Sequence, residues 1–198
     1  GINWFRYQEQ LGDIYIPWKK NYSKSLKNIF PNTKFLNNIK KRHHNATNLL
    51  YVTSEIKDYR VHNSCGPMSI KKTNIFSNLK ILNDNLNEHI KNNILLLTKS
   101  KLNTYFSCIV RNILPKNKIL SKTNLINEIP KAKLIICTYP QTAFMEALSS
   151  GPTILLYNPA QWIPESDMIK YYNDLKKSKI LFDDPKTVSY THLTLPTT

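Results

Sequence analysis

The sequence predicts an α/β fold, with a Rossmann-like parallel sheet and helices on both of its faces. Short apolar runs without polar alternation indicate strands that are buried on both sides. Helical patterns separate these runs, and such alternation is typical of a parallel sheet. The strongest unit runs from Leu134 to Trp162, where a strand, a turn, a helix and a second strand follow one another as a compact βαβ crossover.

The other elements are predicted from the same periodicities, in chain order. Four buried strands are expected to be adjacent and parallel, at residues 49–53, 94–97, 134–137 and 153–157. Weaker strands are expected at residues 13–18, 34–39, 118–120 and 180–182. Helices are expected where apolar residues recur every three or four positions, at residues 21–30, 74–90, 102–114, 125–129, 141–150 and 167–178.

Composition favours a globular protein of a reducing compartment. The net charge of +15 and the pI of about 9.7 would normally suggest nucleic acid or an anionic membrane as partner. However, the lysines are spread among many asparagines and isoleucines, as in AT-rich coding sequence, and no nucleic-acid-binding motif accompanies them. The three cysteines lie far apart, and no apolar run approaches the roughly 18 residues of a transmembrane helix. We therefore expect a cytoplasmic protein and do not expect nucleic acid as its partner.

Both ends of the chain are expected to lie outside one Rossmann-like domain at residues 13–187. Residues 1–12 are interpreted as the end of a missing N-terminal domain or a linker, because Gly1 resembles an internal residue of a longer protein. Residues 188–198 read VSYTHLTLPTT, which fits neither a helical nor a strand period. They resemble translated sequencing-adapter sequence, so we interpret them as a non-native tail whose removal would leave stability unchanged.

The turn after residues 134–137 has the chemistry of a phosphate site. A helix N-terminus presents free backbone N–H groups and a partial positive charge. Thr138 and Thr142 add hydroxyls beside those groups, and Glu146 lies one helical turn after Thr142 on the same face. A carboxylate there could accept hydrogen bonds from a ribose diol. The alternative interpretation makes the threonines ordinary N-caps and Glu146 a solvated helix residue.

The same segment resembles the donor-site segment of GT-B glycosyltransferases. The matching pattern is Thr142-x-x-x-Glu146-Ala-Leu148, followed by Gly151-Pro152 and a strand. The similarity is greatest to transferases of bacterial surface-carbohydrate biosynthesis, and it is firmest over residues 134–181. In one departure Gly151 meets Pro152 directly, where the family has Gly-x-Pro, which shortens the connection from helix to strand.

The resemblance implies that the chain is the C-terminal, donor-binding half of a glycosyltransferase, inactive by itself. It implies transfer of a sugar from a nucleotide-activated donor to a surface polysaccharide or lipid-linked acceptor. No metal or other cofactor is implied, and the protein would work in the cytoplasm in peripheral contact with the inner membrane. The catalytic residues stay unknown, because the acceptor half usually supplies the base. The implied donor-binding residues are Thr138, Tyr139, Gln141, Thr142, Glu146 and Asn158.

Three stretches carry further candidate ligand groups. The long stretch 54–69 would face the ligand crevice, and Arg60 within it could pair with a diphosphate or be an ordinary surface arginine. Residues 40–44 form the densest basic run, which predicts a solvated loop or, alternatively, a contact with phosphate or an anionic membrane. Asn158 follows a strong strand and would line a base or sugar, unless that segment only caps the core with Trp162.

Two other functions stay open at this point. A sugar-nucleotide epimerase of the same fold would convert its substrate without any acceptor. A nonenzymatic basic domain would bind RNA or DNA with a steep salt dependence, and it would not bind nucleotide sugars. The sequence has no dinucleotide-binding glycine motif, P-loop or nucleophile elbow, and no cluster with metal-ligand spacing.

Overall fold

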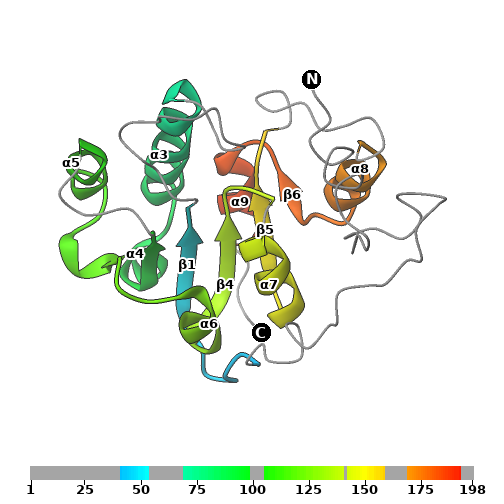
Figure 1. Ribbon diagram of the computed structural model, residues 1–198, viewed down its shortest axis with the longest axis horizontal. Coiled ribbons are helices and arrows are strands. Elements are labelled where there is room, and N and C mark those ends of the chain that lie inside the picture. The colour runs from blue at the N-terminus through cyan, green and yellow to red at the C-terminus, as the bar shows by residue number, and fades with distance from the viewer. Residues whose placement is uncertain (1–40, 54–68, 99–104, 141, 159–168, 193–198) are drawn as a thin grey trace, which may run out of the picture. The chain divides into compact units, whose positions relative to one another are not determined.

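Six parallel strands form the sheet in the part of the chain that the structure describes (Figure 1). The computed structural model describes residues 41–53, 69–98, 105–140, 142–158 and 169–192, all within one unit that spans residues 39–198. The strands are ordered β3-β2-β1-β4-β5-β6. Their bounds are β1 Asn48–Val52, β2 Ile94–Leu97, β3 Ile119–Leu120, β4 Ala132–Cys137, β5 Thr153–Leu156 and β6 Leu181–Phe182.

This order confirms the predicted parallel sheet and its four central strands. β1 pairs with both β2 and β4, and β5 pairs with β4, so the four predicted neighbours are adjacent and parallel. The weaker strands β3 and β6 extend the sheet at its two edges, as expected. The predicted strands at 13–18 and 34–39, and the predicted helix at 21–30, lie outside the described residues.

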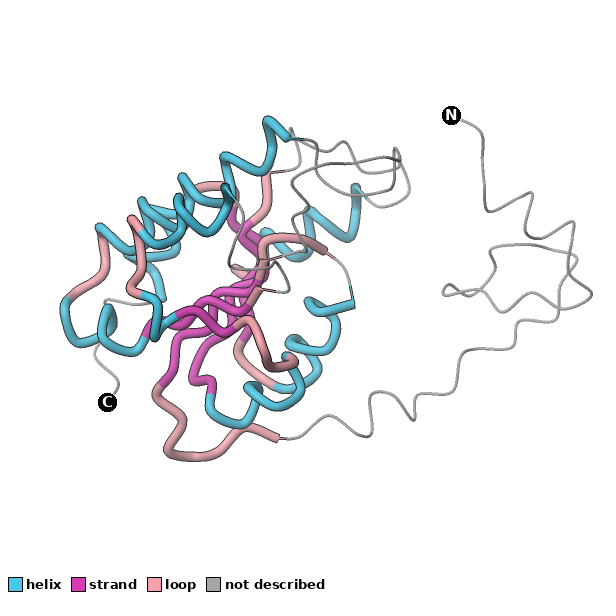
Figure 2. The backbone as a smooth tube through the Cα atoms, turned by 60° about the vertical axis from the view of Figure 1, so that its left-hand side comes forward, coloured by secondary structure: helices cyan, strands magenta, loops and turns pink. Residues whose placement is uncertain are grey.

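Helices cover both faces of the sheet, as predicted (Figures 1 and 2). Side chains alternate along each strand, so Leu49 and Tyr51 enter one core while Leu50 and Val52 enter the other. The first core is covered by α3 (Ser69–Asp84), α5 (Tyr105–Arg111) and α9 (Pro185–His192). The second is covered by α6 (Leu125–Glu128), α7 (Thr142–Ser150) and α8 (Ile169–Lys177).

Short 3₁₀ turns limit two of the weaker elements. η1 (Lys116–Lys118) holds the first residue of the predicted strand 118–120, so β3 begins only at Ile119. η2 (Ile129–Lys131) follows α6 directly, with a proline in its first turn, and leads into β4. None of the helices in the described part is long and apolar enough to cross a membrane.

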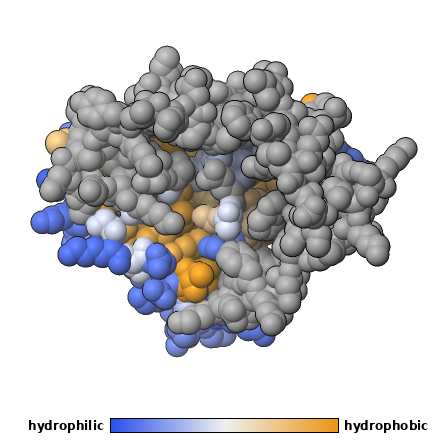
Figure 3. Space-filling view, in the orientation of Figure 1, coloured by the Kyte–Doolittle hydropathy of each residue, from blue (hydrophilic) through white to orange (hydrophobic). Residues whose placement is uncertain are grey.

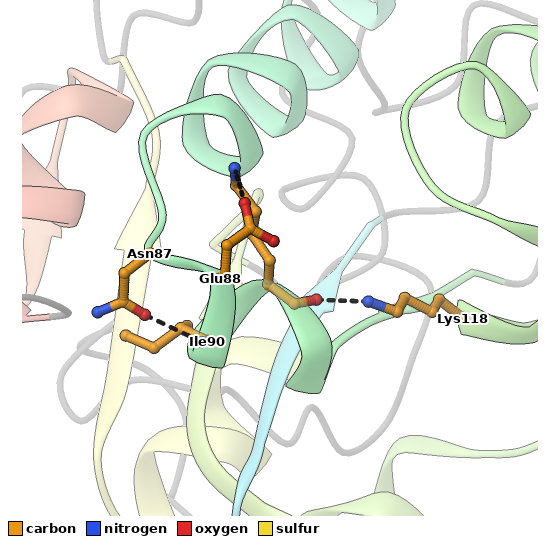
Figure 4. A network of polar contacts seen from close by, with 5 residues as sticks. Asn87, Glu88, Ile90 and Lys118 are labelled. Carbon is orange, nitrogen blue, oxygen red and sulfur yellow. Dashed lines mark hydrogen bonds and ion pairs between the residues drawn. The ribbon is translucent and has the colours of Figure 1, made fainter.

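The predicted continuous helix over residues 74–90 is wrong, because the chain breaks between α3 and a second helix, α4 (Glu88–Asn93). Asn85 and Asn87 cause the break by competing for backbone groups. The Asn85 side chain donates to the Ile81 carbonyl at 2.7 Å, and Asn87 Oδ1 accepts from Ile90 N–H at 3.0 Å as the N-cap of α4. Figure 4 shows this cap beside the Glu88–Lys91 ion pair and the Lys118 ammonium, which donates to the Lys91 carbonyl.

Helix α9 corrects the expectation that the packed domain ends at residue 187. The helix continues to His192, and Val188 is completely buried in the core that α3 covers. Asp184 caps its start by accepting from Lys186 N–H at 3.0 Å, and Pro185 occupies the first helical position. An N-cap aspartate followed by proline is a helix-start signal, and the sequence prediction overlooked it.

Candidate active site

The carboxyl ends of β1 and β4 form the topological switch point of the sheet. In the order 3-2-1-4-5-6 the chain leaves β1 toward α3 on one face and leaves β4 toward α7 on the other. Ligands of such sheets bind in the crevice that these diverging connections open. The predicted phosphate-binding turn after β4 therefore lies at this switch point, as its position at a strand end suggested.

Three buried threonines form a row across this edge of the sheet. Thr98, Thr53 and Thr138 directly follow β2, β1 and β4, and Val52 pairs in register with both Leu97 and Cys137. Thr138 donates its N–H and its hydroxyl to the Val52 carbonyl, both at 3.1 Å. Thr53 donates in the same way to the Leu97 carbonyl, at 3.1 and 3.4 Å. The hydroxyl of Thr138 thus uses its proton to link the end of β4 to β1. Toward any other group it can act only as an acceptor.

Helix α7 places Thr142 and Glu146 as the sequence predicted, one helical turn apart. Thr142 is the first residue of the helix and is exposed, whereas Glu146 is half-buried. The carboxylate of Glu146 acts on the Cys137 thiol at the end of β4 by raising its pKa. Glu146 therefore lies close enough to the end of β4 to influence this thiol. Gln141 and Arg60 lie outside the described residues.

Cys137 is a core thiol, as expected from its apolar surroundings. Its side chain is 1 % exposed, and burial raises its pKa to about 12, with Arg42 opposing the rise and Glu146 adding to it. The thiolate is therefore suppressed, which excludes Cys137 as a nucleophile in this site.

We expect Cys137 to resist iodoacetamide in the native protein at neutral pH, because its thiol is both protonated and covered. Cys108 is exposed and serves as the internal reference, so it should be labelled under the same conditions. Peptide mapping by mass spectrometry after native labelling measures both sites. Equal labelling of the two cysteines would contradict the packing of β4 against α7.

A cluster of three tyrosines lies at the neighbouring strand end. The ring of Tyr157, just after β5, is 6.0 Å from that of Tyr139 in an edge-on arrangement and 6.0 Å from that of Tyr172 in a stacked one. Burial raises the pKa of Tyr157, which the neighbouring tyrosines raise further, and burial also raises that of Tyr172. Tyr139 and the half-buried Asn158 were predicted donor-binding residues, whereas Tyr157 and Tyr172 were not.

Arg42 is the exception in the basic run 40–44, which was predicted as a solvated loop and in which Lys41, His43 and His44 are exposed. Its guanidinium lies at the C-terminus of α7, and burial lowers its pKa to about 10. Its hydrogen-bond acceptors are the carbonyls of Lys133, Ala147 and Pro152 and the hydroxyls of Ser150 and Thr153. A helix leaves its last carbonyls without intrahelical partners, and Arg42 supplies a donor to one of them here, the Ala147 carbonyl.

The glycine of the Gly151-Pro152 junction lies against the same guanidinium. Gly151 has a φ of 141°, which favours glycine, and a Cβ at this position would lie 3.2 Å from Arg42 Nε. Both the backbone conformation and the close guanidinium therefore favour glycine at position 151. Helix α7 still runs regularly to Ser150, so the departure from Gly-x-Pro leaves Glu146 one turn after Thr142.

An open cavity of about 560 Å³ lies near the amino-terminal ends of β1 and β4 rather than at the switch point. It is lined by residues 43–48 and Lys131, and the Lys131 ammonium pairs with Glu128 at 3.2 Å. Figure 3 shows mostly hydrophilic side chains along this lower margin of the molecule. Among the predicted donor-binding residues that the structure describes, none lines the cavity. Within the described ranges, no three His, Cys, Asp or Glu side chains are grouped to hold a metal ion.

Comparison with known proteins gives one family. The model of the LIC12162 family transferases matches residues 4–190 of the chain. A search of curated proteins found no match. The family match covers the sheet, the switch point, α7 and the tyrosine cluster.

Proposed function

Because the chain belongs to the LIC12162 family of transferases, we propose that the group it transfers is a sugar carried by a nucleotide. The donor binds at the carboxyl ends of β1 and β4, with its diphosphate at the N-terminus of α7. The acceptor is a surface polysaccharide or a lipid-linked glycan, and the enzyme works in the cytoplasm against the inner membrane. The pattern Thr142-x-x-x-Glu146-Ala-Leu148, which resembles the donor segment of GT-B glycosyltransferases, supports this assignment.

The observation that carries the proposal is the position of this pattern at the switch point. The β4–α7 turn combines free N–H groups of a helix N-terminus with the exposed hydroxyl of Thr142. Glu146 follows, close enough to the end of β4 to influence the Cys137 thiol. Hydrogen-bond donors for a phosphate and a carboxylate acceptor for a ribose diol therefore lie one helical turn apart on α7.

The site would assist the reaction by stabilising the leaving group. Negative charge develops on the nucleoside diphosphate as the bond to the sugar breaks. The N–H groups and positive dipole end of α7, with the Thr142 hydroxyl, lie where they would neutralise that charge. Such fixed donors act without a metal ion. The general base that activates the acceptor is not assigned to any residue of this chain.

Calorimetric nucleotide binding to Thr142→Ala and Glu146→Gln tests the assignment. Thr142→Ala should weaken binding about tenfold, because a hydrogen bond to a charged phosphate is lost. Glu146→Gln keeps the shape of the side chain but removes the charged acceptor, so it should weaken binding similarly. Only the Glu146→Gln effect should disappear with a 2′,3′-dideoxy nucleotide, which lacks the diol.

Met145→Ala is the matched control, because Met145 lies on the same helix with its side chain 55 % exposed. Unchanged binding in both test variants would support the alternative in which these residues only cap and solvate α7. Conversion of the free sugar nucleotide without any acceptor would instead identify an epimerase. Salt-sensitive RNA or DNA binding without nucleotide binding would identify a nonenzymatic basic domain.

A further inference from the structure

The rings of the tyrosine cluster are packed against one another and could form a rigid surface for a ligand ring. The cluster consists of Tyr139, Tyr157 and Tyr172. The central Tyr157 is 7 % exposed, while Tyr139 and Tyr172 are half-buried and keep part of their rings accessible. The edge-on and stacked pairings are the arrangements that aromatic rings prefer, and they fix the outer rings against the buried one. The accessible parts of the two outer rings are therefore held in place before any ligand arrives.

The position of the cluster relative to α7 limits what it can bind. Tyr139 lies in the turn that leads into α7, Tyr157 follows β5, and Tyr172 belongs to α8. The cluster therefore occupies the β5 and α8 side of the α7 N-terminus. Figure 1 shows α8 on one side of α7 and α6 on the other.

Glu146 lies on the other flank of α7. Ser150, one turn after Glu146 on the same face, accepts from Arg42 Nη2 at 3.2 Å. Arg42 enters from the segment that precedes β1, where the His43 N–H donates to the Pro130 carbonyl in the turn after α6. The flank that carries Glu146 and Ser150 therefore faces β1 and α6, away from the tyrosine cluster.

We propose that the tyrosine cluster stacks against the pyranose ring of the nucleotide-activated donor. This inference rests on the proposed function, which places the diphosphate at the α7 N-terminus and the ribose at Glu146. A nucleotide sugar has its nucleoside at one end of the diphosphate and its sugar at the other. With the nucleoside on the Glu146 flank, the sugar reaches the opposite flank, where the tyrosines lie. The weakly positive C–H groups of a pyranose face complement the negative face of an aromatic ring.

A purely structural role makes a different prediction. Tyr172 also packs α8 against the sheet. If that is its whole role, replacing Tyr172 would weaken the binding of every ligand equally or of none. A stacking surface for the sugar would affect only ligands that carry a sugar. The comparison of a nucleoside diphosphate with its sugar ester separates these two roles.

The experiment measures dissociation constants of the full chain for UDP with UDP-glucose, GDP with GDP-mannose, and dTDP with dTDP-glucose. For the sugar nucleotide that the wild type binds best, Tyr172→Leu should raise the dissociation constant about fivefold. The constant for the matching diphosphate should not change. Tyr172→Phe keeps the ring and should bind both ligands as the wild type does. Tyr139→Leu, at the other end of the cluster, should repeat the Tyr172→Leu result.

Tyr171→Leu is the control, because Tyr171 is the next residue on α8 and is 52 % exposed. Equal weakening of both ligands by Tyr172→Leu and Tyr139→Leu, or no weakening, would overturn the stacking proposal. In that case diphosphate binding that still depends on Thr142 and Glu146 would leave the proposed function standing. Failure of the wild type to bind any of these nucleotides would overturn both proposals.

Discussion

Replacing Arg42 with alanine should lower the free energy of unfolding by about 3–4 kcal/mol. The guanidinium donates to three backbone carbonyls, of Lys133, Ala147 and Pro152, and to two hydroxyls. Alanine would remove these donors from partly covered acceptors, and each such hydrogen bond is worth about 0.5–1.5 kcal/mol. The Ala147 and Pro152 carbonyls would keep one other donor each, the Ser150 hydroxyl and the Ile135 N–H. The substitution would also open a space beside Gly151, where the guanidinium now packs.

Chemical denaturation of two further variants checks the cause of this loss. Lys41→Ala removes a positive charge from the adjacent exposed position and should change stability by less than about 0.5 kcal/mol. Arg42→Lys keeps the charge but lacks the planar fork, so it should recover only part of the stability. Equal stability of Arg42→Ala and Lys41→Ala would show that the basic run is solvated after all.

The central strands could be predicted from the sequence because their environment leaves a local signature. β1, β2, β4 and β5 are buried on both faces, so their residues are apolar without alternation. The helix that begins after β4 could be predicted for a similar reason, since a helix N-terminus after a buried strand is visible within a few residues. The break before α4 was overlooked because the apolar stripe continues through it, although Asn85 and Asn87 marked it.

The remaining parts of the site depend on partners far apart in the sequence. Arg42 and Ser150 are 108 positions apart, so no local pattern links the basic run to the end of α7. Tyr157 and Tyr172 resemble ordinary core aromatics until the fold brings Tyr139 beside them. Thr53 and Thr98 were identifiable only as polar residues at strand ends. They lie side by side at one edge of the sheet because Val52 pairs in register with Leu97, and this register cannot be predicted from the sequence.

Replacing Val188 with aspartate should lower the free energy of unfolding by about 3–4 kcal/mol, because a charged carboxylate would enter an apolar core without a partner. Val188 is 0 % exposed and packs in the same core as Leu79 and Phe182. Thr187→Asn is the control, since Thr187 is exposed and an amide can still donate to the Asp184 carboxylate, as the Thr187 hydroxyl does at 3.5 Å.

Thermal and chemical unfolding of the two variants decides between two accounts of the C-terminal residues. If helix α9 is packed against α3, Val188→Asp is severely destabilised and Thr187→Asn changes stability by less than about 0.5 kcal/mol. If residues from 188 onward are instead a non-native tail, both variants unfold as the wild type does. In that second case another side chain would have to occupy the position of Val188 in the core that α3 covers, because a cavity the size of a valine side chain is itself destabilising.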